Sequence, residues 1–258
     1  MALGIKSALL LALAGSWRSP LLASAGPGGV SYALNPLALH GGPLGSPAAP
    51  GKGPFGDLAY RWAINSMSKD TEREKIANIG TLQIRRTVSG DRVQYKVRQK
   101  RSFGDYESSI VCAAQGSEPL IEWTTRQETT RKGEEPLVSE VAGKVEGSKL
   151  KITRGEMREA TALDGPLISE ISLLANPSCL TPLAEGGFSL LDSGAMVRPN
   201  IRVRRDPEAD TTLDGVTASA WLLTGTGLLP THLMVDGEGR VLCRTMFTTS
   251  LILDRIAS

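Results

Sequence analysis

From Asp57 onward, apolar and polar residues alternate with a period of two along most of the chain. The segment RVQYKVRQK at positions 92–100 is the clearest case, because Val93, Tyr95 and Val97 alternate with polar residues. Successive side chains of a β-strand point to opposite faces, so this pattern predicts strands with one buried and one exposed face. We therefore expect a mainly β fold.

The junctions between these segments are short. Ser89-Gly90-Asp91 separates two alternating segments and is a hairpin signature, since glycine supplies the turn conformation. Parallel strands would need long crossover connections, so short turns predict an antiparallel meander. We expect a single strongly curved antiparallel sheet, or half-barrel, of about ten strands.

The segment DGPLISEISLLANPSC at 164–179 breaks the alternation. Its apolar residues Leu167, Ile168, Ile171 and Leu174 have helical spacing. Pro166 suits a first helical turn, Asn176-Pro177 ends the segment, and Glu170 is its only charge between these limits. A helix this apolar must be covered, so we expect one helix packed on the concave face of the sheet.

This order of elements resembles the open half-barrel of bacterial lipoprotein carriers and their periplasmic relatives. The closing pattern, from Gly227-Leu228-Leu229-Pro230 through Asp236-Gly237 to Gly239-Arg240, is similar to the ending of uncharacterised secreted bacterial β-rich proteins. The resemblance covers about residues 57–254 and implies a half-barrel fold.

The first 56 residues differ from the rest in composition. Lys6, the apolar run 8–15 and Ala23-Ser24-Ala25 together predict a signal peptide over residues 1–25, too short to cross a bilayer. A transit peptide is the alternative, because no acidic residue precedes Asp57. Residues 26–56 are rich in Gly, Pro and Ala and predict a flexible linker. We expect residues 57–258 to form the β domain, which would be periplasmic or secreted and soluble after cleavage of the signal peptide.

The overall charge and the cysteine spacing argue against a nucleic-acid-binding protein, a zinc protein and a redox protein. A net charge of +2 and 5% aromatic residues give no sign of nucleic-acid binding. Cys112, Cys179 and Cys243 are far apart and have no CxxC spacing, so no zinc or redox motif is present. At most one disulfide can form, and its pairing stays open.

His232 is the only histidine after the linker, and a cysteine lies close to it in sequence. A hairpin turn centred on Gly237-Glu238 would place His232 opposite Cys243. A Cys–His dyad would also need a third group and an open, electropositive site, and neither is visible. We interpret this segment as a plain hairpin.

Two charged regions have both a structural and a functional interpretation. Asp206, Glu208, Asp210 and Asp214 form either a solvated acidic loop or a calcium site without the EF-hand pattern. Basic residues concentrate at 85–101 and 198–205. They either keep exposed strands soluble or attract an anionic membrane or an acidic partner.

No phosphate loop, HExxH or G-x-S-x-G motif is present, so the sequence favours a non-enzymatic protein without a metal or cofactor. We expect it to bind a hydrophobic ligand, such as a lipid, an acyl chain or a lipidated partner, in the concave face. The candidate cavity-lining residues are Tyr60, Trp62, Tyr95, Trp123, Leu167, Ile171, Leu174 and Leu233.

Alternatively these residues fill a solid core, and the protein is a scaffold that acts through its outer strands or edges. An exported hydrolase with an unidentified site at the rim is a second alternative, and the oligomeric state stays open.

Overall fold

The computed structural model describes residues 57–66, 75–101, 104–129, 135–192, 195–213, 216–246 and 249–257. The predicted signal peptide (1–25) and linker (26–56) lie outside the described residues. Within the described part, no helix has both the length and the apolar character needed to cross a membrane.

The described residues from 57 to 162 form eight strands and no helix. They are β1 (Asp57–Ser66), β2 (Lys75–Ser89), β3 (Arg92–Arg101), β4 (Gly104–Ala113), β5 (Leu120–Thr129), β6 (Leu137–Glu146), β7 (Lys149–Arg154) and β8 (Met157–Ala162). Each pairs antiparallel with the next one in sequence. This is the predicted meander.

The second half mixes strands with short helices. Its elements are β9 (Leu167–Ser169), α4 (Glu170–Ala175), η1 (Pro177–Cys179), α5 (Leu180–Leu183), β10 (Phe188–Leu191), β11 (Val197–Arg205), η2 (Pro207–Ala209), β12 (Thr211–Leu213), β13 (Val216–Gly225), β14 (Leu228–Asp236), β15 (Val241–Met246) and β16 (Thr249–Ala257).

The strands follow one hydrogen-bonded order, β8-β7-β6-β5-β4-β3-β2-β1-β16-β15-β14-β13-β11-β10-β9, with β12 beside β13. The two halves of the chain therefore join where β1 pairs antiparallel with β16. Strands β9, β10 and β11 form a small second sheet that continues into the large one through β11.

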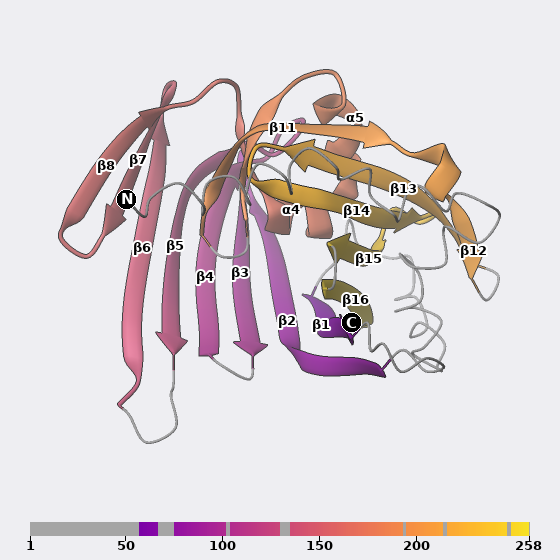
Figure 1. Cartoon of the computed structure of the whole chain (residues 1–258). Coiled ribbons are helices and arrows are strands. Elements are labelled where there is room, and N and C mark those ends of the chain that lie inside the picture. The colour runs from indigo at the N-terminus through magenta and orange to yellow at the C-terminus, as the bar shows by residue number, and fades with distance from the viewer. Residues whose placement is uncertain are drawn as a thin grey trace, which may run out of the picture.

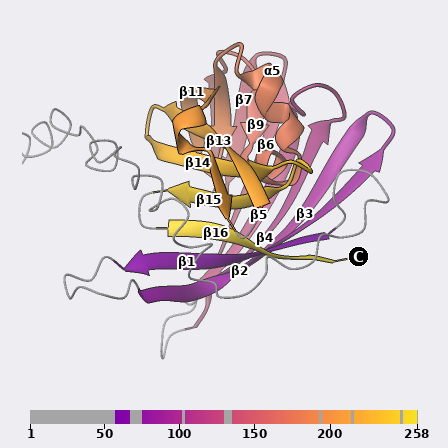
Figure 2. The same ribbon diagram turned by 90° about the vertical axis from the view of Figure 1, so that its right-hand side faces the viewer.

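The sheet curls into a half-barrel. In Figure 1, strands β2 to β6 run roughly upright and β13 and β14 run roughly across, and α4 and α5 lie where the two groups meet. Figure 2 shows β16 beside β1 at the junction of the two halves. Helix α4 is buried along its whole length, as expected for a helix on the concave face.

The alternation in sequence corresponds to alternation in burial. Along β3 the exposed and buried positions alternate from Arg92 to Lys100. The turn before β3 consists of Gly90 and Asp91, and Gly90 has a φ of 61°, a conformation that favours glycine. The predicted hairpin is confirmed.

The predicted number of strands is wrong. The described residues form sixteen strands rather than about ten. Strands β9, β10 and β12 have only three or four residues, too few to show alternation. Strand β8 is exposed at all six positions, so its sequence has no buried apolar face to reveal it.

The predicted helix is shorter than expected, and one strand pair is parallel. Leu167 and Ile168 belong to β9, which pairs parallel with β10. The helix begins only at Glu170, because Ser169 has extended backbone angles and its hydroxyl accepts a 3.2 Å bond from the Ile171 N–H. The run Leu167–Leu174 is nevertheless buried, as predicted.

Candidate functional site on the outer face of the sheet

Six of the eight predicted cavity-lining side chains lie together in one packed core. They are Tyr95, Trp123, Leu167, Ile171, Leu174 and Leu233, each at most 3% exposed. The Trp123 ring packs against β6 so closely that a Cβ at Gly143 would overlap it. The side chains of Tyr60 and Trp62 lie outside the described residues. Ligand binding by this set stays a prediction.

A hollow of about 10 Å³ lies between the sheet and α4. Ile171 lines it from the helix, together with polar side chains that include Gln99, Tyr106, Ser108 and Asp192. Its volume corresponds to about one water molecule, which is too small for an acyl chain.

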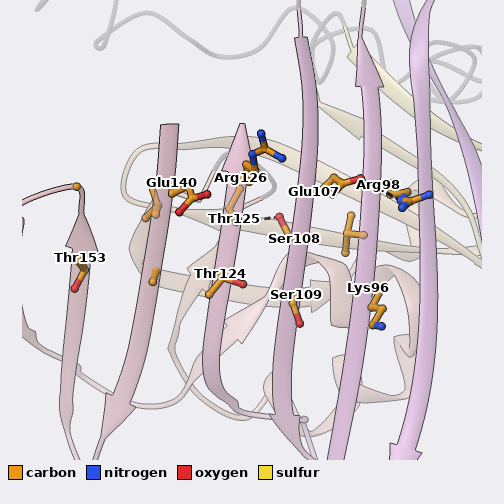
Figure 3. A pocket seen from close by; sticks show the side chains of 14 residues that line it. Lys96, Arg98, Glu107, Ser108, Ser109, Thr124, Thr125, Arg126, Glu140 and Thr153 are labelled. Carbon is orange, nitrogen blue, oxygen red and sulfur yellow. Dashed lines mark hydrogen bonds and ion pairs between the residues drawn. The ribbon is translucent and has the colours of Figure 1, made fainter. Parts of the chain in front are cut away.

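A much larger hollow, of about 650 Å³, crosses strands β3 to β7 on the opposite, outer face. Its lining residues come in two rows of cross-strand neighbours, which Figure 3 shows side by side. One row is Arg98, Glu107, Arg126 and Glu140, which we call the charge ladder. The other is Lys96, Ser109, Thr124, Ala142 and Thr153, which we call the small-residue row.

The strand pleat places both rows on the solvent side. Lys96 and Arg98 are exposed, whereas Val97 between them is buried. Ser108 and Thr125, which also lie between the rows, bond to each other through their hydroxyls at 2.9 Å. The hollow therefore lies over the backbone of these intervening residues and is open to solvent.

The charge ladder alternates in sign from strand to strand. Arg98 Nε lies 3.2 Å from Glu107 Oε1, and these side chains are 72% and 59% exposed. Arg126 lies next to Glu107 and Glu140 in register, and its Nη2 is 3.9 Å from Glu128 Oε2. Exposed ion pairs contribute little to stability, so these charges remain available to a partner.

The sequence predicted exposed basic residues here but not the ladder. The outward positions of β3 include Arg92, Lys96, Arg98 and Lys100, all exposed. Alternation alone shows that these side chains face solvent. Which charge lies beside which depends on the register of three hairpins, and that information is not local.

A buried carboxylate lies at one end of the core. Glu118, 3% exposed, accepts bonds from Arg86 Nη2 at 2.6 Å, from Asn176 Nδ2 at 2.8 Å and from the Tyr95 hydroxyl. Burial and the neighbouring carboxylate raise the pKa of Tyr95. These hydrogen bonds connect the β4–β5 loop to strands β2 and β3 and to the end of α4.

A second buried pair joins α4 to β15. Arg244 Nη2 lies 2.5 Å from Glu170 Oε1, and each side chain is 4% exposed. Arg101 lies near the pair and stacks on Tyr106 at 5.3 Å. Burial lowers the pKa of Arg101. These opposite charges compensate one another, so we assign the cluster to packing of the helix.

The structure does not place His232 opposite Cys243. His232 pairs with Thr245, and Cys243 pairs with Met234. The Asp236 carboxylate accepts bonds from the N–H groups of Glu238 and Arg240, which lengthens the turn and shifts the register. His232 Nε2 instead lies 3.1 Å from Asp206 Oδ2. The geometry gives no Cys–His dyad.

All three cysteines are buried free thiols. Burial raises the pKa of Cys243 to about 12 and that of Cys179 to about 12, and it also raises the pKa of Cys112. A thiol that stays protonated is a poor nucleophile.

The acidic loop has its own partners. Asp206 contacts His232, and Asp210 accepts two 2.8 Å bonds from Arg205. The Arg205 partner lowers the pKa of Asp210. Asp214 lies outside the described residues. Among the residues that are described, no group of three His, Cys, Asp or Glu side chains could hold a metal ion.

Comparison with known proteins gives a structural likeness but no family. No known protein family and no curated protein matches the sequence. A solved structure, that of a β-barrel-like protein of the domain of unknown function DUF1849 from Brucella abortus, is similar with a TM-score of 0.47 and 8% identity, over 76% of this chain and 93% of that one. This chain is therefore similar to a β-barrel-like protein of unknown function, and the resemblance to lipoprotein carriers stays a prediction.

Proposed function

We propose that the protein is a non-enzymatic interaction module that binds another polypeptide across the outer face of strands β3 to β7. The observation that carries this proposal is the position of the hollows. The hollow of about 650 Å³ lies on the exposed face, whereas the hollow beside α4 measures about 10 Å³.

The lining of the outer hollow suits a polypeptide. Lys96, Arg98 and Arg126 supply positive charge, and Glu107 and Glu140 supply negative charge. An anionic membrane would match only the three cations and not the two carboxylates, whereas a protein surface presents both signs. Hydroxyls of Ser109 and Thr124 add donors and acceptors between the charges.

A hydrophobic ligand in the concave face is the function predicted from sequence, and it remains a second proposal. Helix α4 is buried in the core on the concave face, so an acyl chain there would have to displace it or the side chains around it. Organic extraction of the purified protein followed by mass spectrometry tests this directly. Lipid at one molecule per chain would favour this carrier function over the interaction module.

We further propose that the protein acts outside the cytoplasm. The support is the predicted signal peptide at 1–25 and its Ala23-Ser24-Ala25 cleavage site. Cell fractionation with mass spectrometry of the mature N-terminus tests this location.

Site-specific photocrosslinking tests the interaction proposal. A photoreactive amino acid replaces Thr124 in the hollow in one variant, and exposed Glu208 on η2 in the control variant. We expect an adduct of defined mass from Thr124 alone, identified by mass spectrometry. The adduct should disappear when Arg126→Glu is added.

Two outcomes would contradict the proposal. One is a Thr124 variant that gives no adduct in cells where the chain is made. The other is an adduct that survives Arg126→Glu unchanged, because contact would then not depend on the charge ladder.

A further inference from the structure

The charge ladder is complementary to its own reverse. Read from β3 to β6 its signs are plus, minus, plus, minus, for Arg98, Glu107, Arg126 and Glu140. Read in the opposite direction they are minus, plus, minus, plus. Two identical ladders that face each other in opposite directions therefore match at all four positions.

A two-fold axis produces this arrangement. If the axis runs along the strands between β4 and β5, the outer faces of two copies meet and the order of the strands reverses. Glu107 then faces Arg126 of the second copy, and Arg98 faces Glu140 of the second copy. Every contact occurs twice, as in any isologous interface.

The neighbouring small-residue row permits close approach under the same axis. Lys96 would face Ala142 of the second copy, and Ser109 would face Thr124 of the second copy. No like charges meet in this row. On the other side of the ladder Asp105 would face Glu128 of the second copy, so the contact is expected to centre on the ladder and the small-residue row.

We propose that the partner of the outer face is a second copy of this chain, held in a two-fold dimer by the charge ladder. This inference rests on the proposed function and names its partner. Because single exposed ion pairs are weak, the ladder sets the orientation of a weak, salt-sensitive dimer.

Two charge reversals test the arrangement. Glu107→Arg brings like charges together twice in its own dimer, and so does Arg126→Glu. A mixed dimer of the two variants again has opposite charges at all four ladder positions. We expect each variant alone to dimerise at least about tenfold more weakly than the natural chain, and the mixture to regain the dimer. Analytical ultracentrifugation of the full chain at low and high salt measures this.

Matched controls separate the ladder from net charge. Glu208→Arg and Arg202→Glu make the same changes in net charge at exposed positions on η2 and β11, and they should leave the dimer unchanged. Asp105→Asn removes the like-charge contact and should strengthen the dimer. Recovery in the mixture also shows that both reversal variants are folded.

Three results would overturn this inference. They are a chain that stays monomeric at low salt, a dimer that neither reversal weakens, and a mixture that does not recover. If the Thr124 crosslink identifies a different polypeptide, the proposed interaction function stands, but the inference that a second copy of this chain is the partner is wrong.

Discussion

At the scale of single residues, Glu118 connects two strands and a helix, and the sequence did not suggest it. It lies in the β4–β5 loop with a φ of 53°, a conformation uncommon for a residue with a side chain. Its contacts reach Arg86 on β2, Tyr95 on β3 and Asn176 at the end of α4. The hydrogen bonds of the carboxylate therefore compensate for an unfavourable backbone angle.

Replacing Glu118 by alanine should lower the free energy of unfolding by about 3–5 kcal/mol, because the Arg86 guanidinium would stay buried without its counter-charge. Urea denaturation measures the change. Glu146→Ala is the control, since it removes an exposed carboxylate paired with Lys151 and should have no measurable effect. Equal midpoints for the two variants would show that the buried cluster does not stabilise the fold.

The buried thiols predict how stability changes at high pH. An unfolded cysteine loses its proton near its ordinary pKa of 9.0, whereas folded Cys243 keeps its proton up to about 12. Between these values the unfolded chain binds fewer protons, so stability falls as pH rises. Unfolding midpoints across this range should decline less steeply for Cys243→Ala than for the natural chain. If the unfolding midpoints of the two proteins fell equally steeply with pH, the raised pKa of Cys243 in the folded state would be contradicted.

His232 shows why a site can be misassigned from sequence. Its position on a strand that ends in a hairpin was predicted correctly from alternation and the glycines at 237 and 239. The partner was wrong, because the Asp236 carboxylate bonds two N–H groups of the turn and a bulge follows between Met234 and Val235. Turn length is set by such side-chain bonds, and the spacing of glycines does not reveal them.

At the scale of elements, α4 is held by charge as well as by apolar packing. All six of its residues are buried, and Glu170 among them pairs with Arg244 on β15. The sequence indicated the burial, since Glu170 is the only charge in a mainly apolar segment. It could not indicate that the first part of the segment is a strand, because short buried strands and helices share the same apolar composition.

Arg244→Met should destabilise the protein by about 3 kcal/mol, because buried Glu170 would lose the guanidinium 2.5 Å away, although Arg101 still attracts it. The double variant Arg244→Met/Glu170→Leu removes both charges of the pair and should recover part of the loss, since Arg101 then loses the attraction of Glu170. Urea denaturation of the two variants and the natural chain measures both steps. A double variant no more stable than Arg244→Met would show that the pair is not the main interaction between helix and strand.

At the scale of the whole molecule, the pairing of β1 with β16 joins two halves that are each continuous in sequence. The order of strands passes from β2 through β1 to β16 and β15, so the last strand closes the structure on the first. Local alternation predicted the meander of the first half well. Local alternation could not predict the pairing of β1 with β16, because this contact joins residues nearly 200 positions apart and depends on the curl of the whole sheet.

A chain that ends at Met246 lacks β16 and tests this closure. It would lose Leu251 and Ile252, both fully buried, and would leave β1 and β15 as unpaired edges. Unpaired edges template association between chains, and losing large core side chains costs about 2–5 kcal/mol each. We therefore expect aggregation and no cooperative urea transition, measured by light scattering and circular dichroism. Met157→Ala, at an exposed side chain on the outermost strand β8, should leave both measurements unchanged. A shortened chain with a cooperative transition and an unchanged dependence on urea would mean that the two halves hold together without the last strand.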